Sequence, residues 1–532
     1  MLVEVAGATT SERRALRILQ AAAVLVVLAA ITWKTYELDR FFIPKELTLH
    51  LAACITGVLL VRRIRETRFT WVDSLLVVHV LLALVSSIFA TNHWLALRGL
   101  AISVSGVTIF WVARVLQNAG LRRPLLGAVA LAVVVGCITS LMQTYGFETD
   151  FFSINRAPGG TFGNRNFVAH MAAFGLPVLV LMAVTARHFL GWLAGTLGTV
   201  LVVATLFLTR SRAAWLAAGA VLLVIAFALV ASPALRRHGR TWRRLLGIGL
   251  LGAAGVLGAL LAPNALDWRS DNPYLESMRD VANYEEGSGR GRLVQYRQSL
   301  EMMMANPVLG VGPGNWAVEY ADYAADNDPS MDRSTAGMTS NPWPSSDWVA
   351  LFAERGIIAG VLLVLAVMGI AVRGLYQLFS ALEPEDALRA AALLGTLLAA
   401  SIAGLFDAVL LLALPTLLVW AAVGALYDPG VGRLGLPPRL RSASLAALAI
   451  LAGVGAWRSA MQLTAMGIDT ELEGSGWLQR AAFIDPGNYR VRLQLGRGGS
   501  GLERDDRCAH AHAAHALYPN AGEARRLSNA CD

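Results

Sequence analysis

Charged side chains are scarce in this chain. Only 15% of its 532 residues are Asp, Glu, Lys or Arg, whereas 55% are hydrophobic, and the mean hydropathy is +0.53. This balance excludes an ordinary soluble domain. Runs of about 20 apolar residues recur along the chain, and each is long enough to cross about 30 Å of hydrocarbon as a helix. The sequence therefore predicts an all-α, polytopic membrane protein with about 12–13 transmembrane helices.

The apolar runs divide the chain into a membrane domain, residues 1–460, and two polar pieces. One piece is a long loop at 264–345 within the membrane domain, and the other is the tail, residues 461–532. The second run is short and two later runs nearly touch, so the count of spans is uncertain by one or two. The predicted spans lie near residues 15–33, 47–61, 72–91, 95–116, 124–144, 167–186, 188–209, 212–231, 245–263, 348–372, 387–407, 409–427 and 442–460.

No small-residue cleavage site follows the first run, so we expect this run to remain as an anchor. Lys and Arg are unevenly distributed over the short loops. With the N-terminus inside, the inner loops hold 21 of them and the outer short loops hold 8. This positive-inside pattern predicts that the long loop and the tail are both extracytoplasmic. Because the basic residues are spread over many inner loops, the net charge of +8 does not indicate nucleic-acid binding.

Cysteine is also rare, with four residues in the chain. Cys54 and Cys137 lie within predicted spans, where we expect small core side chains. Cys508 and Cys531 lie in the tail, where an extracytoplasmic location permits a disulfide. A helical hairpin at the end of the tail brings these two cysteines to the same open end. We therefore predict a disulfide worth about 3 kcal/mol through loop closure.

The tail contains a weak internal repeat. "AAFIDPGNY" at 481–489 resembles "AHALYPNAGEA" at 514–524, and Pro486 and Pro519 are 33 residues apart, close to the tetratricopeptide period. Two such units are too few for a solenoid. The repeat predicts a short tetratricopeptide-like helical tail that packs on the membrane domain.

Ionisable residues are rare at the midplane and the inner third of the predicted spans. A transporter needs polar groups near the midplane, and a channel needs a polar path through the membrane, so this scarcity disfavours both classes. The charges that do occur gather at the outer third and predict a one-sided polar bowl, which suits an enzyme acting on a lipid-linked substrate. These residues are Arg98, Arg165, Arg210, Arg212, Asp347, Glu354, Arg355 and Asp407.

The arginines of this bowl indicate which head group it receives. A guanidinium matches phosphate oxygens in bidentate geometry. Arg210 and Arg212, together with Arg98 or Arg165, are therefore predicted to hold a diphosphate at the interface. Ordinary snorkelling of each arginine to the membrane surface is the alternative.

The long loop contains a predicted amphipathic helix, "GRGRLVQYRQSLEMMMANP" at 289–307, which is able to lie on the membrane. Its start is basic, with Arg290, Arg292 and Arg297. The glycine-rich stretch "GVGPGNW" at 310–316 is expected to form a turn, because a lone glycine loop is weak evidence for phosphate binding. The apolar face of the helix consists of Leu293, Tyr296, Leu300 and Met303 or Met304.

Two carboxylates mark the start of the tenth predicted span, "SSDWVALFAERGIIAG". Asp347 and Glu354 are seven residues apart and so share one helix face. Asp347 has two interpretations, an N-terminal cap and a general base that takes a proton from an attacking hydroxyl. Ser345 or Ser346 would cap the helix in the second case. Glu354 either contributes to catalysis or pairs with an arginine and braces the bowl.

These stretches together resemble the O-antigen ligase and O-antigen polymerase superfamily, bacterial membrane glycosyltransferases of the GT-C type. The resemblance covers roughly residues 15–430. The motifs that carry it are "DRFFIPKELTLHLAA" (39–53), "SSIFATNHWLALRGL" (86–100), "GGTFGNRNFVAHM" (159–171), "LTRSRAAW" (208–215), "GRLVQYRQSLEMMMANPVLGVGPGNW" (291–316) and "SSDWVALFAERGIIAG" (345–360).

The resemblance implies an inverting, metal-independent transfer of glycan from undecaprenyl diphosphate, with no cofactor. The acceptor would be lipid A–core, another glycan chain or a protein hydroxyl. The family's diphosphate-contacting arginine after the seventh span matches Arg212, with Arg210 beside it. An arginine early in the long loop matches Arg292, or Arg290 with a small shift. The location implied is a bacterial inner membrane, with a cytoplasmic N-terminus and a periplasmic tail.

One residue departs from the family pattern. The family usually has a His–Asn pair at the start of the last motif, and that histidine is assigned to activate the acceptor. Here Ser345 occupies its position, and serine cannot act as a base at neutral pH. Asp347 takes the role, or His170 or His93 reaches in from another span, or the chain has another task.

Three functions follow from these observations. The leading one is a glycosyltransferase that ligates or polymerises lipid-linked surface polysaccharide. The second is a non-catalytic binding or assembly protein of the same pathway, which the missing histidine favours. The third is protein O-glycosylation, because the tail is suited to a protein partner or acceptor. No metal site is predicted in the tail, because a disulfide removes Cys508 from any ligand set that includes His510, His512 and His515.

Overall fold

The computed structural model describes residues 7–153, 156–268, 270, 272–279, 287–325, 328–332, 337–430 and 435–532. Within these residues eleven helices are long and apolar enough to cross a membrane, so the protein is all-helical and polytopic, as predicted. They are α2 (Asp39–Leu60), α3 (Trp71–Ile88), α4 (His93–Asn118), α5 (Arg122–Thr144), α6 (Arg165–Val184), α7 (Phe189–Leu208), α8 (Arg212–Ala231), α10 (Gly239–Leu261), α14 (Asp347–Ser380), α15 (Pro384–Phe406) and α17 (Pro438–Glu471).

Two expected spans fall outside this set. The first helix, α1 (Thr10–Leu28), carries arginines in its first half and begins with a capping box between Thr9 and Glu12. The other is α16 (Ala413–Leu426), which has only 14 residues, all of them buried. The apolar run that predicted α16 begins at 409, but the chain is not yet helical there. Asp347 binds three backbone N–H groups of that stretch, and this holds the turn before α16 open.

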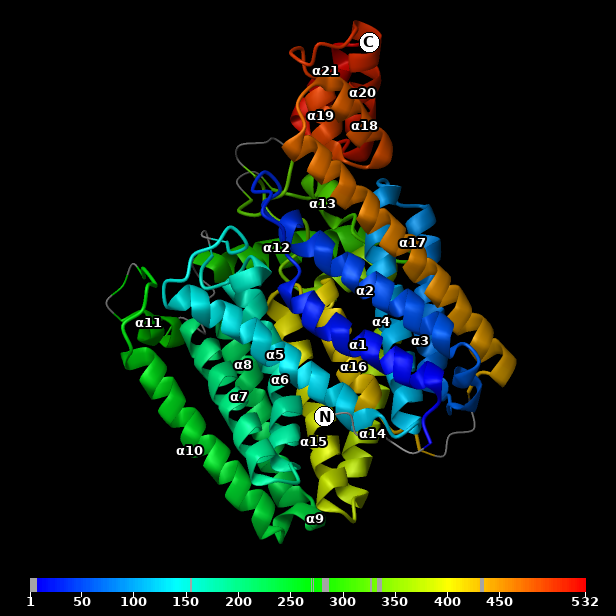
Figure 1. Ribbon diagram of the computed structural model, residues 1–532. Helices are drawn as coiled ribbons and strands as arrows, with labels where there is room; N and C mark the ends of the chain where they lie inside the picture. The colour runs from blue at the N-terminus through cyan, green and yellow to red at the C-terminus, as the bar shows by residue number, and fades with distance from the viewer. Residues whose placement is uncertain are drawn as a thin grey trace.

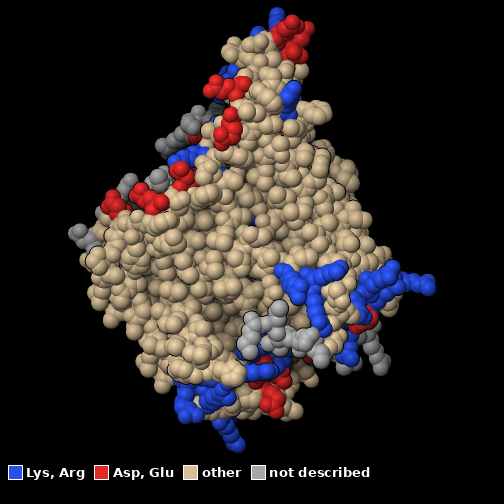
Figure 2. Space-filling model, viewed as in Figure 1, with Lys and Arg blue, Asp and Glu red and all other residues tan. Residues whose placement is uncertain are grey.

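The bundle is polar at its two ends. The short helix α9 (Pro233–Arg236) and the start of α10 form the lower end in Figure 1, whereas α11 (Pro273–Arg279), α12 (Gly287–Ala305) and α13 (Trp316–Glu319) lie on the upper side. Figure 2 shows a broad uncharged band around the middle of the same face. Lys and Arg gather at the lower end, and Asp and Glu lie mostly at the upper end and on the tail.

The tail stands at the upper end, on the same side as α11, α12 and α13 of the long loop at 264–345, which we call the outer loop (Figure 1). It is held there because α17 does not end with the membrane span at 460 but continues to Glu471. The tail is two helix pairs: α18 (Ser475–Ile484), α19 (Tyr489–Gly496), α20 (Arg504–Leu517) and α21 (Gly522–Asn529). Cys508 and Cys531 form a disulfide with Cα atoms 5.5 Å apart, which is the pair named from the sequence. The tail docks on α4, where the Trp94 indole donates to the Asp485 carboxylate at 2.6 Å.

One buried charge pair lies where the sequence predicted few charges. Arg114, near the end of α4, donates to the Asp73 carboxylate at the start of α3, and both side chains are fully buried. The Trp111 indole donates to the same carboxylate at 3.0 Å. The expectation of a charge-poor inner third is therefore wrong at this position. Arg114 also donates to the Arg68 carbonyl, whereas its Nε has no hydrogen-bond partner within the described residues. Such additional hydrogen bonds help a buried pair to offset the cost of its desolvation.

A break divides the helix α14. Gly356 has φ +78° and ψ 168°, so the helix stops at residue 355 and restarts at residue 357. The outer loop fills the gap, since the N–H groups of Val311 and Gly312 donate to the carbonyls of Ala353 and Glu354 at 3.0 and 2.8 Å. The Ile357 N–H donates to the Pro307 carbonyl at 2.8 Å. A side chain at position 356 would lie 2.2 Å from the Val308 carbonyl oxygen, so only glycine fits here.

Candidate functional site

The predicted diphosphate arginines are brought together in part. Arg165, the first residue of α6, and Arg210, at the turn between α7 and α8, both stack on the indole of Trp268. Their guanidinium carbons lie 4.9 and 4.6 Å from the ring centroid. Stacking on one aromatic ring holds the two guanidinium groups close to each other.

The backbone at Arg210 is unusual. Its φ is +54°, and it is the one residue other than glycine with positive φ among those described. This conformation costs of order 1–3 kcal/mol for a residue with a Cβ, and such strain is concentrated at functional sites. The side chain also donates from Nε to the Ser277 hydroxyl at 2.9 Å. The fold therefore holds Arg210 in one orientation above the start of α8.

The remaining predicted arginines take three different positions. Arg212 is the half-buried first residue of α8, next to Arg210 in the same turn. Arg290 is exposed in the first turn of α12. Arg292 is half-buried one turn further on, and its buried Nε has no hydrogen-bond partner within the described residues. Of the two candidates in the long loop, Arg292 is thus the one that faces inward.

His170 is buried in α6, five residues after Arg165. Neither of its ring nitrogens has a hydrogen-bond partner within the described part of the chain. Asp407 and Arg292 are close enough to act on it electrostatically. Asp407 is itself joined to α6, because the Asn166 amide donates to its carboxylate at 3.4 Å. A buried imidazole without partners is costly, and its usual explanation is a ligand, a water or a catalytic role.

Together these residues form what we call the α6 site, defined as Arg165, His170, Arg210, Arg292 and Asp407. They come from α6, from the turn before α8, from α12 and from the turn after α15. All five residues were candidates from the sequence. Trp268, which holds two of the arginines, was not, because one tryptophan in a long loop carries no periodic or motif signal.

Asp347 does not fit the role of a general base. Its carboxylate accepts three hydrogen bonds, from the N–H groups of Val409, Leu410 and Leu411, at 2.9, 2.8 and 3.2 Å. These donors take up three of the about four acceptor sites of a carboxylate and fix its orientation. The residue is buried and joins the start of α14 to the turn before α16. The helix cap is Ser346, whose hydroxyl accepts from the Val349 N–H and donates to the Gly404 carbonyl.

Ser345, at the position of the family histidine, serves as a contact for α12. Its N–H donates to the Gln295 side-chain oxygen at 2.6 Å, and its carbonyl accepts from the Tyr296 hydroxyl at 2.8 Å. The same hydroxyl donates to the Leu405 carbonyl at 2.6 Å. Tyr296 was predicted on the apolar face of α12, but it faces the bundle. Leu293, Leu300 and Met304 form the exposed face of that helix.

Glu354 and Arg355 are both buried beside the break in α14. The Glu354 carboxylate lies 4.0 Å from the Arg355 guanidinium and accepts from the Trp316 N–H at 3.4 Å. Arg355 donates to the Ser103 hydroxyl at 2.9 Å. This is the bracing arrangement, and it leaves Glu354 without a place in the α6 site. The N–H groups of Val311 and Gly312 in the glycine-rich stretch are bonded to α14, so they do not form a phosphate cradle.

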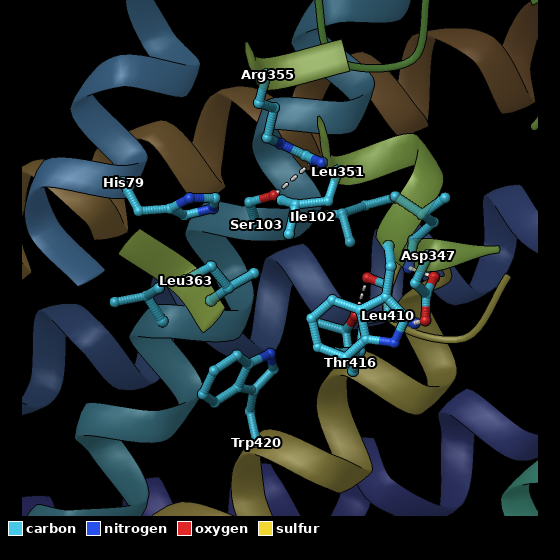
Figure 3. Close-up of a pocket in the computed structure, with 13 residues that line it drawn as sticks. His79, Ile102, Ser103, Asp347, Leu351, Arg355, Leu363, Leu410, Thr416 and Trp420 are labelled. Carbon is cyan, nitrogen blue, oxygen red and sulfur yellow. Dashed lines mark hydrogen bonds between the residues drawn. The ribbon is translucent and has the colours of Figure 1, made fainter. Parts of the chain in front are cut away.

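A small hollow lies below this region, between Asp347 and Arg355. Its volume is about 50 Å³, which is room for one or two waters. Figure 3 shows Arg355 reaching Ser103 on one side and Asp347 turned toward Leu410 on another. The two charged groups therefore do not converge on a common point in the hollow.

Arg98, the other arginine predicted to hold a diphosphate, is bound to carboxylates instead. Its guanidinium binds the buried Glu46 carboxylate through Nε and Nη2 at 2.9 and 2.6 Å, and it lies 3.3 Å from Asp39. Two carboxylates neutralise its charge, so it does not offer a cation to a substrate. His93 is exposed at the first turn of α4, and its Nε2 lies 3.1 Å from the Ile88 carbonyl oxygen.

The fold and the gathered arginines define a multi-pass membrane protein with a cationic site at one end of its helix bundle. Residues 197–364 match the family model described as O-antigen ligase, so the chain carries an O-antigen ligase family domain over that range. The matched range contains Arg210, Arg292 and the broken start of α14. No curated protein matches the chain.

Proposed function

We propose that this protein transfers or polymerises glycan from an undecaprenyl diphosphate donor at the periplasmic face of a bacterial inner membrane. The observation that carries the proposal is the gathering of Arg165 and Arg210 on one indole, with an O-antigen ligase domain spanning Arg210. The basic lower end of Figure 2 supports a cytoplasmic location for that end and a periplasmic location for the site.

The arginines act on the leaving group. When an acceptor hydroxyl attacks the anomeric carbon, a new C–O bond forms and the bond between that carbon and the diphosphate oxygen breaks. The electron pair of the broken bond goes to the diphosphate, whose charge grows in the transition state. Guanidinium groups held in place by Trp268 and Ser277 stabilise that charge without having to reorganise. Attack from the face opposite the leaving group inverts the anomeric centre.

His170 is our choice for the base. It replaces Asp347, whose oxygens are occupied, and Ser345, which cannot take a proton at neutral pH. An imidazole with a free nitrogen accepts the proton of the attacking hydroxyl, and Asp407 stabilises the imidazolium that forms. Arg292 lies near the same imidazole and offsets part of that stabilisation.

The test is a turnover assay. The purified protein is supplied with undecaprenyl-diphosphate glycan from its own cell envelope, and released undecaprenyl diphosphate is measured. We expect release by the wild type and loss of release in the double variant Arg165→Ala/Arg210→Ala. The control is Arg236→Ala/Arg237→Ala, which removes the same charge from two exposed arginines at the other end of the bundle.

Ser345 favours a second candidate, a non-catalytic binding protein of the same pathway. The same assay separates the two. Binding of the donor without release, in the wild type and in His170→Gln alike, contradicts the enzyme and supports the binding protein.

A further inference from the structure

A second cavity lies apart from the α6 site, between the membrane domain, the outer loop and the tail. We call it the tail cavity. Its volume is about 460 Å³, which is within the range of about 300–1,000 Å³ typical of small-molecule sites. α2 and α4 line one side, residues 338–343 of the outer loop line another, and residues 485–490 of the tail close it.

Aromatic rings are prominent in the lining. Trp94 belongs to α4, Trp343 to the outer loop, and Tyr489 and Tyr518 to the tail. The two tyrosine rings lie 4.9 Å apart. Flat rings of this kind pack against the C–H faces of sugar rings, as they do against other apolar surfaces.

Arg98 and Arg458, two arginines of the tail cavity, already have protein partners. Arg98 binds Glu46 and Asp39, and Arg458 donates to the Trp94 carbonyl and the Gln462 side-chain oxygen at 3.0 and 2.8 Å. A lining whose cations are already held by carboxylates and carbonyls does not attract a diphosphate. It offers carboxylate, amide and guanidinium groups to hydroxyls instead.

Two buried donors in the lining have no partner within the described residues. They are the Tyr489 hydroxyl and the Arg355 Nε. Burial raises the pKa of Tyr489 to about 12 and that of Tyr518 to about 12, so both phenols keep their protons near neutral pH. Unsatisfied buried donors are expected where a ligand supplies the acceptors.

We propose that the tail cavity binds a short saccharide segment of the transferred or receiving glycan, held by Trp94, Trp343 and the tail residue Tyr489. This inference rests on the proposed function, which supplies the glycan. The tail is then part of the site rather than a separate appendage.

One contact joins the two sites. Trp343 lines the tail cavity and packs against Phe167 of α6, with ring centroids 6.4 Å apart, and against Phe42 of α2 at 5.2 Å. Phe167 follows Arg165 by two residues and precedes His170 by three. Three aromatic rings therefore form the boundary between the tail cavity and the α6 site.

Two probes test the proposal on the full-length protein. The first is the oligosaccharide released from the lipid-linked glycan of the producing cell by mild acid, freed of lipid and phosphate. The second is sugar-free undecaprenyl diphosphate. We expect Tyr489→Phe to weaken oligosaccharide binding about 5- to 10-fold, the loss of one or two hydrogen bonds, and Trp343→Leu to weaken it further. Neither variant should change binding of the sugar-free lipid. Tyr376→Phe, which removes an exposed hydroxyl from α14, is the matched control.

The outcomes separate this inference from the proposed function. Unchanged oligosaccharide affinity in both variants, with lipid diphosphate binding lost in Arg165→Ala/Arg210→Ala, overturns the saccharide site and leaves the proposed function intact. The reverse result supports the tail cavity and contradicts the donor site. A raised KM for the acceptor in Tyr489→Phe assigns the cavity to the acceptor glycan, whereas weaker binding of the sugar-bearing donor alone assigns it to the donor glycan; either result supports a saccharide site.

Discussion

The α6 site and the tail cavity use the same residue type in opposite ways. In the tail cavity, Arg98 lies against two carboxylates. In the α6 site, Arg165 and Arg210 both stack on the indole ring of Trp268. Among the described residues, Arg165 has no carboxylate within salt-bridge distance. We propose that stacking on Trp268 orients these arginines toward a ligand, whereas ion pairing with two carboxylates makes Arg98 part of the fold. The partner of an arginine, rather than its depth in the membrane, then indicates its role.

The largest expected effect is a loss of stability when Glu46 of the tail cavity is replaced. Glu46 is buried and Arg98 is partly buried, so Glu46→Gln leaves Arg98 with Asp39 as its remaining carboxylate partner. Breaking a buried pair costs about 3–5 kcal/mol, which is the upper bound here. We expect a clear fall in the apparent melting temperature in detergent. The double variant Glu46→Gln/Arg98→Met should recover most of it, because removing both charges leaves no uncompensated ion. A single variant as stable as the wild type would contradict the pairing argument.

Removal of the disulfide should have the next largest effect. Cys508→Ser/Cys531→Ser frees a loop with a sequence separation of 23, and we expect a loss of about 3 kcal/mol confined to the tail. Limited proteolysis of the tail measures it. Binding of sugar-free undecaprenyl diphosphate should stay the same, because the α6 site contains no tail residue.

His170→Gln should lower turnover about 100-fold or more, the usual contribution of a general base, while leaving donor binding and melting temperature near those of the wild type. Single-turnover release of undecaprenyl diphosphate measures it. Asp347→Asn is the comparison: it should weaken the fold and lower activity only in proportion to the protein lost. Equal activity per folded molecule in His170→Gln and wild type would remove the histidine from the mechanism.

Arg210→Lys should have a smaller effect, about 10-fold on the KM for the donor. Lysine keeps the charge, but it loses the planar fork and most of the stacking on Trp268. Steady-state kinetics with varied donor check it. Arg98→Lys should lower stability without changing the KM for the donor, so the two lysine variants distinguish the roles of the two arginines.

The smallest effect concerns pH. Burial, followed by the charge of Arg492, lowers the pKa of His510 in the tail below its ordinary value of about 6.5. As the pH falls, the unfolded tail takes up a proton on His510 before the folded tail does. This histidine therefore does not destabilise the folded tail above about pH 6.5, and it lowers the stability of the folded tail as the pH falls from there toward the lower pKa of the folded state. Proteolysis of the tail should quicken modestly at pH 5.5 relative to pH 7.5, and the increase should disappear in His510→Gln.

Much of this architecture is contained in local sequence pattern. Apolar runs locate seven of the eleven long helices to within three residues at both ends, and the hairpin at the end of the tail follows from its proline turns. The helices α2, α10, α14 and α17 each extend six or more residues past the predicted span at one end. The last turns of α17 were missed because they rest on the tail rather than on lipid. The break at Gly356 was not predictable, since the apolar run continues through it and its cause is a loop some fifty residues earlier in the chain.

The candidate site shows the same division. Composition and position singled out Arg165 and Arg210, because charge in an apolar span is informative by itself. His170 was named as an alternative base because the family resemblance places Ser345 where a histidine is usual. The role of Asp347 was not accessible, because its partners are backbone groups about sixty residues further along. Arg458 was overlooked for a related reason. It is buried against Trp94, which lies far away in the chain, as well as against its neighbour Gln462.

The break in α14 has a consequence for biogenesis. In hydrocarbon a broken helix leaves backbone groups exposed unless something else bonds to them. Here residues 307–312 supply those bonds, and they precede α14 in the chain. The loop is therefore synthesised before the helix, and α14 completes its hydrogen bonding only when it packs against the loop. Excising the loop to obtain a minimal membrane core would remove half of that joint and leave α14 to refold as a continuous rod.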